Sequence, residues 1–109
     1  MNEENILANE LMPAVLTHPG EVIKDEIECR GISQHTLSQQ TGIAYSAINE
    51  MLNGRRAITE KTALLLEAAL DISAETIMRM QYRYNMLKAK KDSSFMARVA
   101  NIRKVTAVL

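Results

Sequence analysis

Apolar residues recur every three or four positions along most of this chain, as they do on one face of an α-helix. The segment "EKTALLLEAAL" shows this spacing most clearly, with Ala63, Leu66 and Leu70 at i, i+3 and i+7. Only the last residues, "KVTAVL", are compatible with the period of two that indicates a half-buried strand. The pattern therefore predicts an all-α protein.

Helix start and stop signals divide the central part of the chain into five short helices. In the first, Pro19 suits the opening turn, Val22, Ile23 and Ile27 form the apolar face, and Gly31 can end the helix in a left-handed conformation. The other predicted helices are "QHTLSQQT" after Ser33, Tyr45–Leu52 before Asn53-Gly54, "EKTALLLEAAL" after Thr59, and a longer helix after Ser73 that carries Ile77, Met80, Tyr84 and Leu87.

Residues 1–17 are predicted to form an N-terminal tail. Leu7 and Leu11 have the i, i+4 spacing of a short amphipathic helix, but Pro13 interrupts it. We interpret this segment as one that packs loosely on the body of the protein.

Residues 92–109 are predicted to form a C-terminal helical extension. Phe95, Val99 and Ile102 recur at i, i+4 and i+7, which places an apolar stripe on a short helix. This stripe packs against one of three surfaces, which the sequence does not distinguish: the protein's own core, a second copy of the chain, or a different protein. The chain is thus divided into the tail, a domain over residues 18–91, and this extension.

The net charge of zero conceals a separation of charge along the chain. Residues 1–30 have a balance of −5, residues 31–78 of −2, and residues 79–109 of +7. Such separation indicates two partners of different character, or attraction between the two ends. The overall charge therefore does not exclude binding to nucleic acid.

The chemistry-bearing residues do not indicate an enzyme. Cys29 is the one cysteine, so no internal disulfide forms, and a reducing compartment is favoured. His18, interpreted as a helix-start residue, and His35, interpreted as an exposed helical residue, have no metal-ligand spacing with Cys29, so we expect no metal and no cofactor. The N-terminus carries glutamates where a signal peptide carries Lys or Arg, and no apolar run approaches the ~20 residues of a membrane span. We expect a cytoplasmic protein without a membrane partner.

The second and third predicted helices are separated only by Gly42-Ile43-Ala44. Two helices joined by a three-residue turn that opens on glycine have helix-turn-helix geometry. Gly42 supplies the positive φ of the turn, Leu37 holds the first of the two helices in the core, and the small Ser38 lets the second cross closely over it.

With Ile48 and Met51 or Leu52 buried, the third helix turns its other side outward, and we predict that this side enters a DNA major groove. The residues predicted to contact bases are Ala44, Tyr45, Ser46, Asn49 and Glu50. Charges beyond the helix end would hold the sugar-phosphate backbone while neutral groups recognise the base edges. The residues predicted to contact phosphate are Ser33, Gln34, Asn53, Arg55 and Arg56.

The run "HPGEVIKDEI…ISQHTLSQQTGIAYSAINEMLNGRRAITEKTALLLEAALDISAE…MQYRYNM" resembles the HigA-type antitoxins. These are Xre-like helix-turn-helix proteins with a five-helix, lambda-repressor-like fold. The likeness spans about residues 18–87, and its most specific pieces are "HPGE" at the first helix and "INEMLNGRRAI" at the third.

The resemblance implies a homodimeric antitoxin. Such a protein neutralises a HigB-type toxin, a ribosome-dependent mRNA endonuclease, and represses its own operon by binding an inverted repeat in double-stranded operator DNA. It also implies base contacts from the third helix and backbone contacts from the Asn-Gly-Arg-Arg loop, which match Tyr45, Ser46, Asn49, Arg55 and Arg56. A plain Xre-type repressor without a toxin, and an adaptor that binds only protein, are the alternatives.

We place the predicted dimer contacts on the fifth helix and the extension, at Tyr84, Leu87 and Phe95. The sequence also departs from the family pattern at three places. Ala44 stands where a Ser or Thr usually caps the recognition helix, Asp71 replaces a Gly, and Thr76-Ile77 replaces a bulky aromatic pair. Asp71 tolerates the left-handed conformation that Gly would take there. We expect the fold to be kept despite all three changes.

Overall fold

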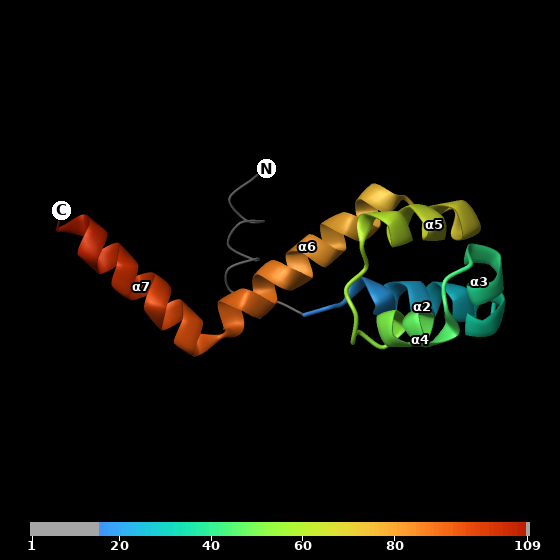
Figure 1. The fold of residues 1–109 in the computed structure, drawn as a ribbon, viewed down its shortest axis with the longest axis horizontal. Coiled ribbons are helices and arrows are strands. Elements are labelled where there is room, and N and C mark those ends of the chain that lie inside the picture. Colours follow the sequence, from blue (N-terminus) through green and yellow to red (C-terminus); the bar gives the residue numbers. More distant parts are fainter. Residues whose placement is uncertain (1–15, 109) are drawn as a thin grey trace. The chain divides into compact units, whose positions relative to one another are not determined.

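The computed structural model describes residues 16–108. Within this range the secondary structure is entirely helical, which confirms the all-α prediction. The helices are α2 (Pro19–Cys29), α3 (Gln34–Thr41), α4 (Tyr45–Leu52), α5 (Glu60–Leu70), α6 (Ala74–Lys91) and α7 (Ser93–Ala107), labelled as in Figure 1. The tail predicted for residues 1–17 falls almost wholly outside the described residues.

The described residues hold six helices rather than five, because the C-terminal extension forms the 15-residue α7. The period of two noted at "KVTAVL" does not form a strand, since residues 104–107 belong to this helix. Asp92 begins α7 by accepting a hydrogen bond from the backbone N–H of Phe95 at 3.1 Å. That bond, together with one from Ser94, holds the pKa of the Asp92 carboxyl below its usual value.

Residues 17–84 form one compact unit, and residues from Asn85 onward belong to a second. In the first unit α4 packs against both α2 and α3, and α3 also packs against α5 (Figure 1). The buried apolar residues of this unit are Ile23, Ile27, Leu37, Ile48, Met51, Leu52, Ile58, Ala63, Leu66, Leu70, Ala74 and Ile77. Val22 does not join them: the prediction that it lies on the buried face is wrong, since its side chain is 42% exposed.

The helices begin and end at the residues that the sequence indicated. Ser33 accepts a hydrogen bond from the N–H of Thr36 at 3.0 Å, and Thr59 caps α5 in the same way through Thr62. Gly31, Gly42 and Gly54 all have positive φ. Asp71 has a φ of 57°, which confirms that it takes the left-handed conformation.

Three side-chain bonds to the backbone fix the segments around α5. The Gln81 side chain is buried on α6 and accepts a hydrogen bond from the N–H of Ile58 at 2.9 Å. Glu67 accepts from the N–H of Ala74 at 3.0 Å, and Arg30 donates to the carbonyl oxygen of Leu70 at 2.7 Å. The contacts to Ala74 and Leu70 satisfy backbone groups that helix ends leave without partners. The contact from Gln81 to Ile58 holds the loop between α4 and α5 from the α6 side.

The first turn of α2 lies directly on the last turn of α4. A Cβ atom placed on Gly20 would lie 1.7 Å from the backbone carbonyl oxygen of Met51, and a distance this short is not compatible with a side chain. The absence of a side chain at Gly20 therefore sets how closely α2 approaches α4.

We expect Gly20→Ala to lower the free energy of unfolding by about 2–3 kcal/mol, because the new methyl group forces α2 away from α4. Chemical denaturation with urea measures the difference. Gly31→Ala is the matched control: no atom lies within 4 Å of its added Cβ, but its φ is +71°. It tests the cost of the left-handed backbone alone, about 1 kcal/mol. Equal losses in the two variants would contradict the close approach.

Candidate nucleic-acid interface

The turn between α3 and α4 is held by side chains of α3. Gly42 has a φ of 75°, as the turn requires. The Ser38 hydroxyl donates to the carbonyl oxygen of Ile43, so this residue not only is small but also fixes the turn. The Thr41 hydroxyl donates to the carbonyl oxygen of Leu37 at 2.8 Å and accepts from the N–H of Ile43 at 3.2 Å. The angle between the two helices is thereby fixed by local hydrogen bonds.

Helix α4 divides into a buried face and an outward face. Ile48, Met51 and Leu52 are buried, as predicted. Of the residues predicted to contact bases, Ala44, Tyr45 and Ser46 are exposed and Asn49 and Glu50 are half-buried. The first turn of α4 is therefore the most accessible part of this helix.

The side chains of α3 hold two of the residues on the outward face of α4. Asn49 donates from Nδ2 to Oε1 of Gln34 at 3.0 Å, which joins a predicted base contact to a predicted phosphate contact. The ring of His35 lies against that of Tyr45, with centroids 5.7 Å apart. His35 is exposed, as predicted, but its contact with Tyr45 gave no signal in the sequence because it depends on how α3 and α4 cross.

The end of α4 turns the chain back toward Glu50. The N–H of Gly54 bonds to the carbonyl oxygen of Met51 at 3.1 Å, and the N–H of Arg55 bonds to that of Glu50 at 2.8 Å. With Gly54 at a φ of +73°, this is a Schellman motif. The loop after α4 therefore has a defined backbone conformation.

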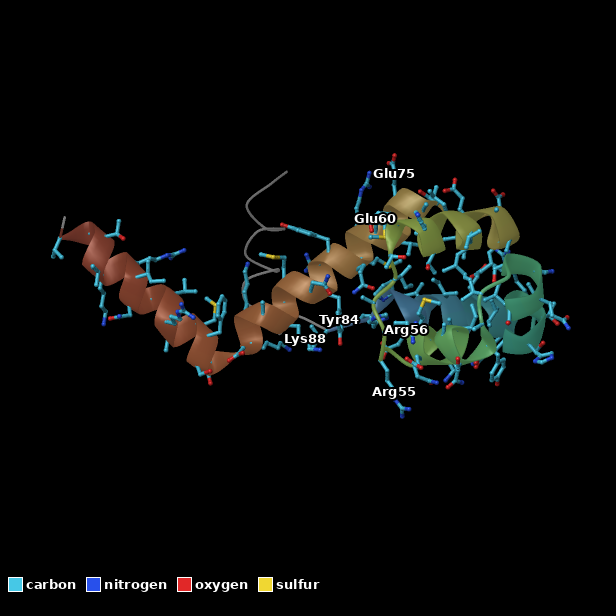
Figure 2. The ribbon with its side chains drawn as sticks, in the orientation of Figure 1. Arg55, Arg56, Glu60, Glu75, Tyr84 and Lys88 are labelled. Atoms are coloured by element: carbon cyan, nitrogen blue, oxygen red, sulfur yellow. The ribbon has the colours of Figure 1, made fainter. Side chains whose placement is uncertain are left out.

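The two arginines of this loop have different surroundings. Arg56 donates from Nε to Oε2 of Glu50 at 3.1 Å, whereas within residues 16–108 the side chain of Arg55 makes no ion pair or hydrogen bond. Figure 2 shows Arg55 extending from the loop away from the helices of its unit, with Glu60 and Glu75 on the other side. Arg55 is thus accessible to a phosphate group without breaking a contact.

Lys24 of α2 is a neighbour of this loop that sequence reasoning missed. Its Nζ donates to Oδ1 of Asn53 at 3.3 Å, and Nδ2 of Asn53 donates to the carbonyl oxygen of Asn49 at 2.9 Å. Both polar atoms of the Asn53 amide, predicted to contact phosphate, are therefore engaged in hydrogen bonds. Ser33, another such residue, caps α3.

The three residues predicted to make dimer contacts differ in exposure. Tyr84 is half-buried and its ring meets that of His18 edge to face, with centroids 4.9 Å apart. His18 is buried and caps α2 by accepting from the N–H of Gly20 at 2.9 Å, as the helix-start interpretation expected. Leu87 is half-buried and Phe95 is 47% exposed.

In the described range of the chain, no three His, Cys, Asp or Glu side chains come together as they do around a metal ion. Nor is any helix between residues 16 and 108 both long and apolar enough to span a bilayer.

The short glycine turn, the buried inner face of α4 and its outward first turn together define a helix-turn-helix domain. Residues 23–77 match the family described as helix-turn-helix, and the chain belongs to this family. Virulence-associated protein I of Dichelobacter nodosus is 35% identical to this chain over 82 residues, which cover 74% of each protein.

Solved structures extend this likeness. An addiction module antidote protein of the HigA family from Coxiella burnetii has 25% identity and a TM-score of 0.63, covering 88% of this chain and 97% of that one. PA4674 from Pseudomonas aeruginosa, in complex with its 18-bp operator DNA, has 26% identity and a TM-score of 0.60, covering 85% and 92%. The resemblance to HigA-type antitoxins is confirmed, and the family is one of DNA-binding regulators rather than of enzymes.

We expect Ala44→Ser to stabilise the domain by about 1 kcal/mol, because Ala44 is the N-cap of α4 and provides no side-chain hydrogen bond. A serine there can accept from the free N–H groups of the first turn. Urea unfolding measures the gain, and Ser33→Ala, which removes the existing cap of α3, should lose a similar amount. An Ala44→Ser variant no more stable than the natural protein would contradict the open cap.

Proposed function

We propose that this chain is an antitoxin that neutralises a HigB-type toxin and, as a homodimer, represses its own operon. The observation that carries the DNA-binding part is the outward first turn of α4, with Arg55 in the loop beyond the other end of this helix, where its side chain has no partner among residues 16–108. Tyr45 and Ser46 provide base contacts there, and Arg55 provides a charge for the backbone. Binding to operator DNA is a function of the cytoplasm, and the proposed location of the protein is therefore cytoplasmic.

The proposed DNA complex inserts α4 of each copy into a major groove. Two copies on an inverted repeat would place their α4 helices in successive grooves, roughly 34 Å apart. Gln34, in the first turn of α3, then lies toward the phosphates on the far side of the groove. Its amide oxygen also accepts the hydrogen bond from Asn49. In this arrangement Ser46 and Asn49 contribute specificity and Arg55 contributes affinity.

The toxin and dimer contacts rest on other parts of the chain. The exposed acidic residues of α2, Glu21, Asp25 and Glu28, fit a partner with a cationic RNA-binding surface. For the dimer, α7 supports a contact with a second copy, because none of its described side chains is buried and Phe95 and Ile102 are both exposed. Tyr84 and Leu87 on α6 are the further proposed dimer contacts.

The antitoxin function is tested by co-purification from the native host, followed by a band shift on the DNA upstream of the gene. We expect a small basic protein, encoded beside this gene, to co-purify with it. We also expect the free protein to shift an inverted repeat as a dimer, with a half-site bound more weakly. A specific band shift without any co-purifying partner would instead favour the plain Xre-type repressor.

We expect Arg55→Ala to weaken binding to operator and unrelated DNA by the same factor. The plot of log K against log salt should become flatter by about 0.9 for each bound copy, roughly 1.8 for the dimer, because each copy loses one phosphate contact and its counterion release. Ser46→Ala is the comparison variant, since it should keep the salt slope and lower base preference by ~1–3 kcal/mol at a strongly contacted pair. Fluorescence anisotropy at several salt concentrations measures both. A changed sequence preference in Arg55→Ala, with an unchanged slope, would contradict these roles.

A further inference from the structure

We infer that Glu50 is an intramolecular competitor of DNA phosphate: its carboxylate binds Arg56 in the free protein and thereby lowers the affinity for DNA of any sequence. The inference rests on the proposed DNA binding, and it assigns the two adjacent arginines different functions. It also replaces the predicted base contact of Glu50 with a different function.

The contact arises from the way α4 ends. Glu50 and Arg56 are six residues apart, too far to meet within one helix. The Schellman motif brings them together, because the N–H of Arg55 bonds to the carbonyl oxygen of Glu50 itself. The other two ion pairs of the described residues, Arg30–Glu26 and Arg79–Glu75, join i and i+4 of a single helix. The Glu50–Arg56 pair instead joins the recognition helix to the loop expected at the phosphates.

The chemistry of the pair allows direct competition. A guanidinium donates to carboxylate and to phosphate through the same N–H groups, so the Glu50 carboxylate occupies donors that phosphate would use. Both side chains are solvated, with relative exposures of 52% for Arg56 and 42% for Glu50. An ion pair of this kind changes an equilibrium constant by less than about tenfold, so DNA can separate it.

Two consequences follow for the bound state. If the pair persists on DNA, Glu50 neutralises the charge of Arg56 beside the phosphates and reduces counterion release. If Arg56 turns to a phosphate, the Glu50 carboxylate is left near a polyanion that repels it. Either way the carboxylate weakens binding to every sequence, whereas a base contact from Glu50 would strengthen binding to the operator alone.

The test is Glu50→Gln, which keeps the size and hydrogen-bonding capacity of the side chain and removes its charge. We expect this variant to bind operator and unrelated DNA roughly threefold to tenfold more tightly for each bound copy, with a salt slope steeper by up to about 0.9 per copy. In an Arg56→Ala background the same change should gain much less, since the guanidinium for which Glu50 and phosphate compete is absent. In an Arg55→Ala background it should gain as much as in the natural protein, because the Arg55 side chain has no ion pair with Glu50 and the backbone bond from Arg55 to Glu50 is kept.

Each other result counts against the inference in an identifiable way. A loss of affinity for the operator alone would make Glu50 a base contact. Unchanged affinity and slope, or a gain that survives Arg56→Ala, would remove the competition while leaving the DNA-binding function intact. Failure of both the natural protein and Glu50→Gln to bind any DNA, with urea unfolding unchanged, would remove the proposed function itself.

Discussion

The burial of one face of α4 between α2 and α3 is the constraint on which the rest of this domain depends. Ile48, Met51 and Leu52 fix which side of the helix faces inward, and Gly20 sets how closely α2 approaches its last turn. Because α4 is only two turns long, it has little stability of its own and takes its position from these contacts. The orientation of every side chain on the outward face follows from this packing.

The outward face is held by polar contacts rather than by further packing. Gln34 supports Asn49, and Lys24 supports Asn53, each from a neighbouring helix. Such contacts fix side chains before a ligand arrives and so reduce the entropy lost on binding. Tyr45 lies at an exposed position and its ring contacts that of His35.

The charges are distributed unevenly around this face. Arg55 is accessible, Arg56 is paired with Glu50, and acidic residues of α2 lie close to Asn53 along one side of the loop. In the proposed DNA complex, such an interface gains limited affinity from phosphate contacts, which supports the proposal that two copies bind together. The charge separation along the chain agrees with this, because the excess positive charge lies after residue 78 and not around α4.

The sequence by itself determined the local structure of this protein. Ser33, Thr59, Gly31, Gly42 and Asp71 act through backbone groups within a few residues, so their effect on helix ends is visible in the chain alone. The inner face of α4 was equally predictable, since helical periodicity and the glycine turn fix it together.

Only the tertiary structure decided which polar residues meet. The contacts Gln34–Asn49, Lys24–Asn53 and Gln81–Ile58 join residues from 15 to 29 positions apart, and no local pattern indicates such distances. Glu50 is the clearest case, because helical periodicity placed it correctly on α4 while the loop conformation supplied Arg56 as its partner. Local sequence specifies where a side chain lies on its helix, but its partners depend on how the helices pack.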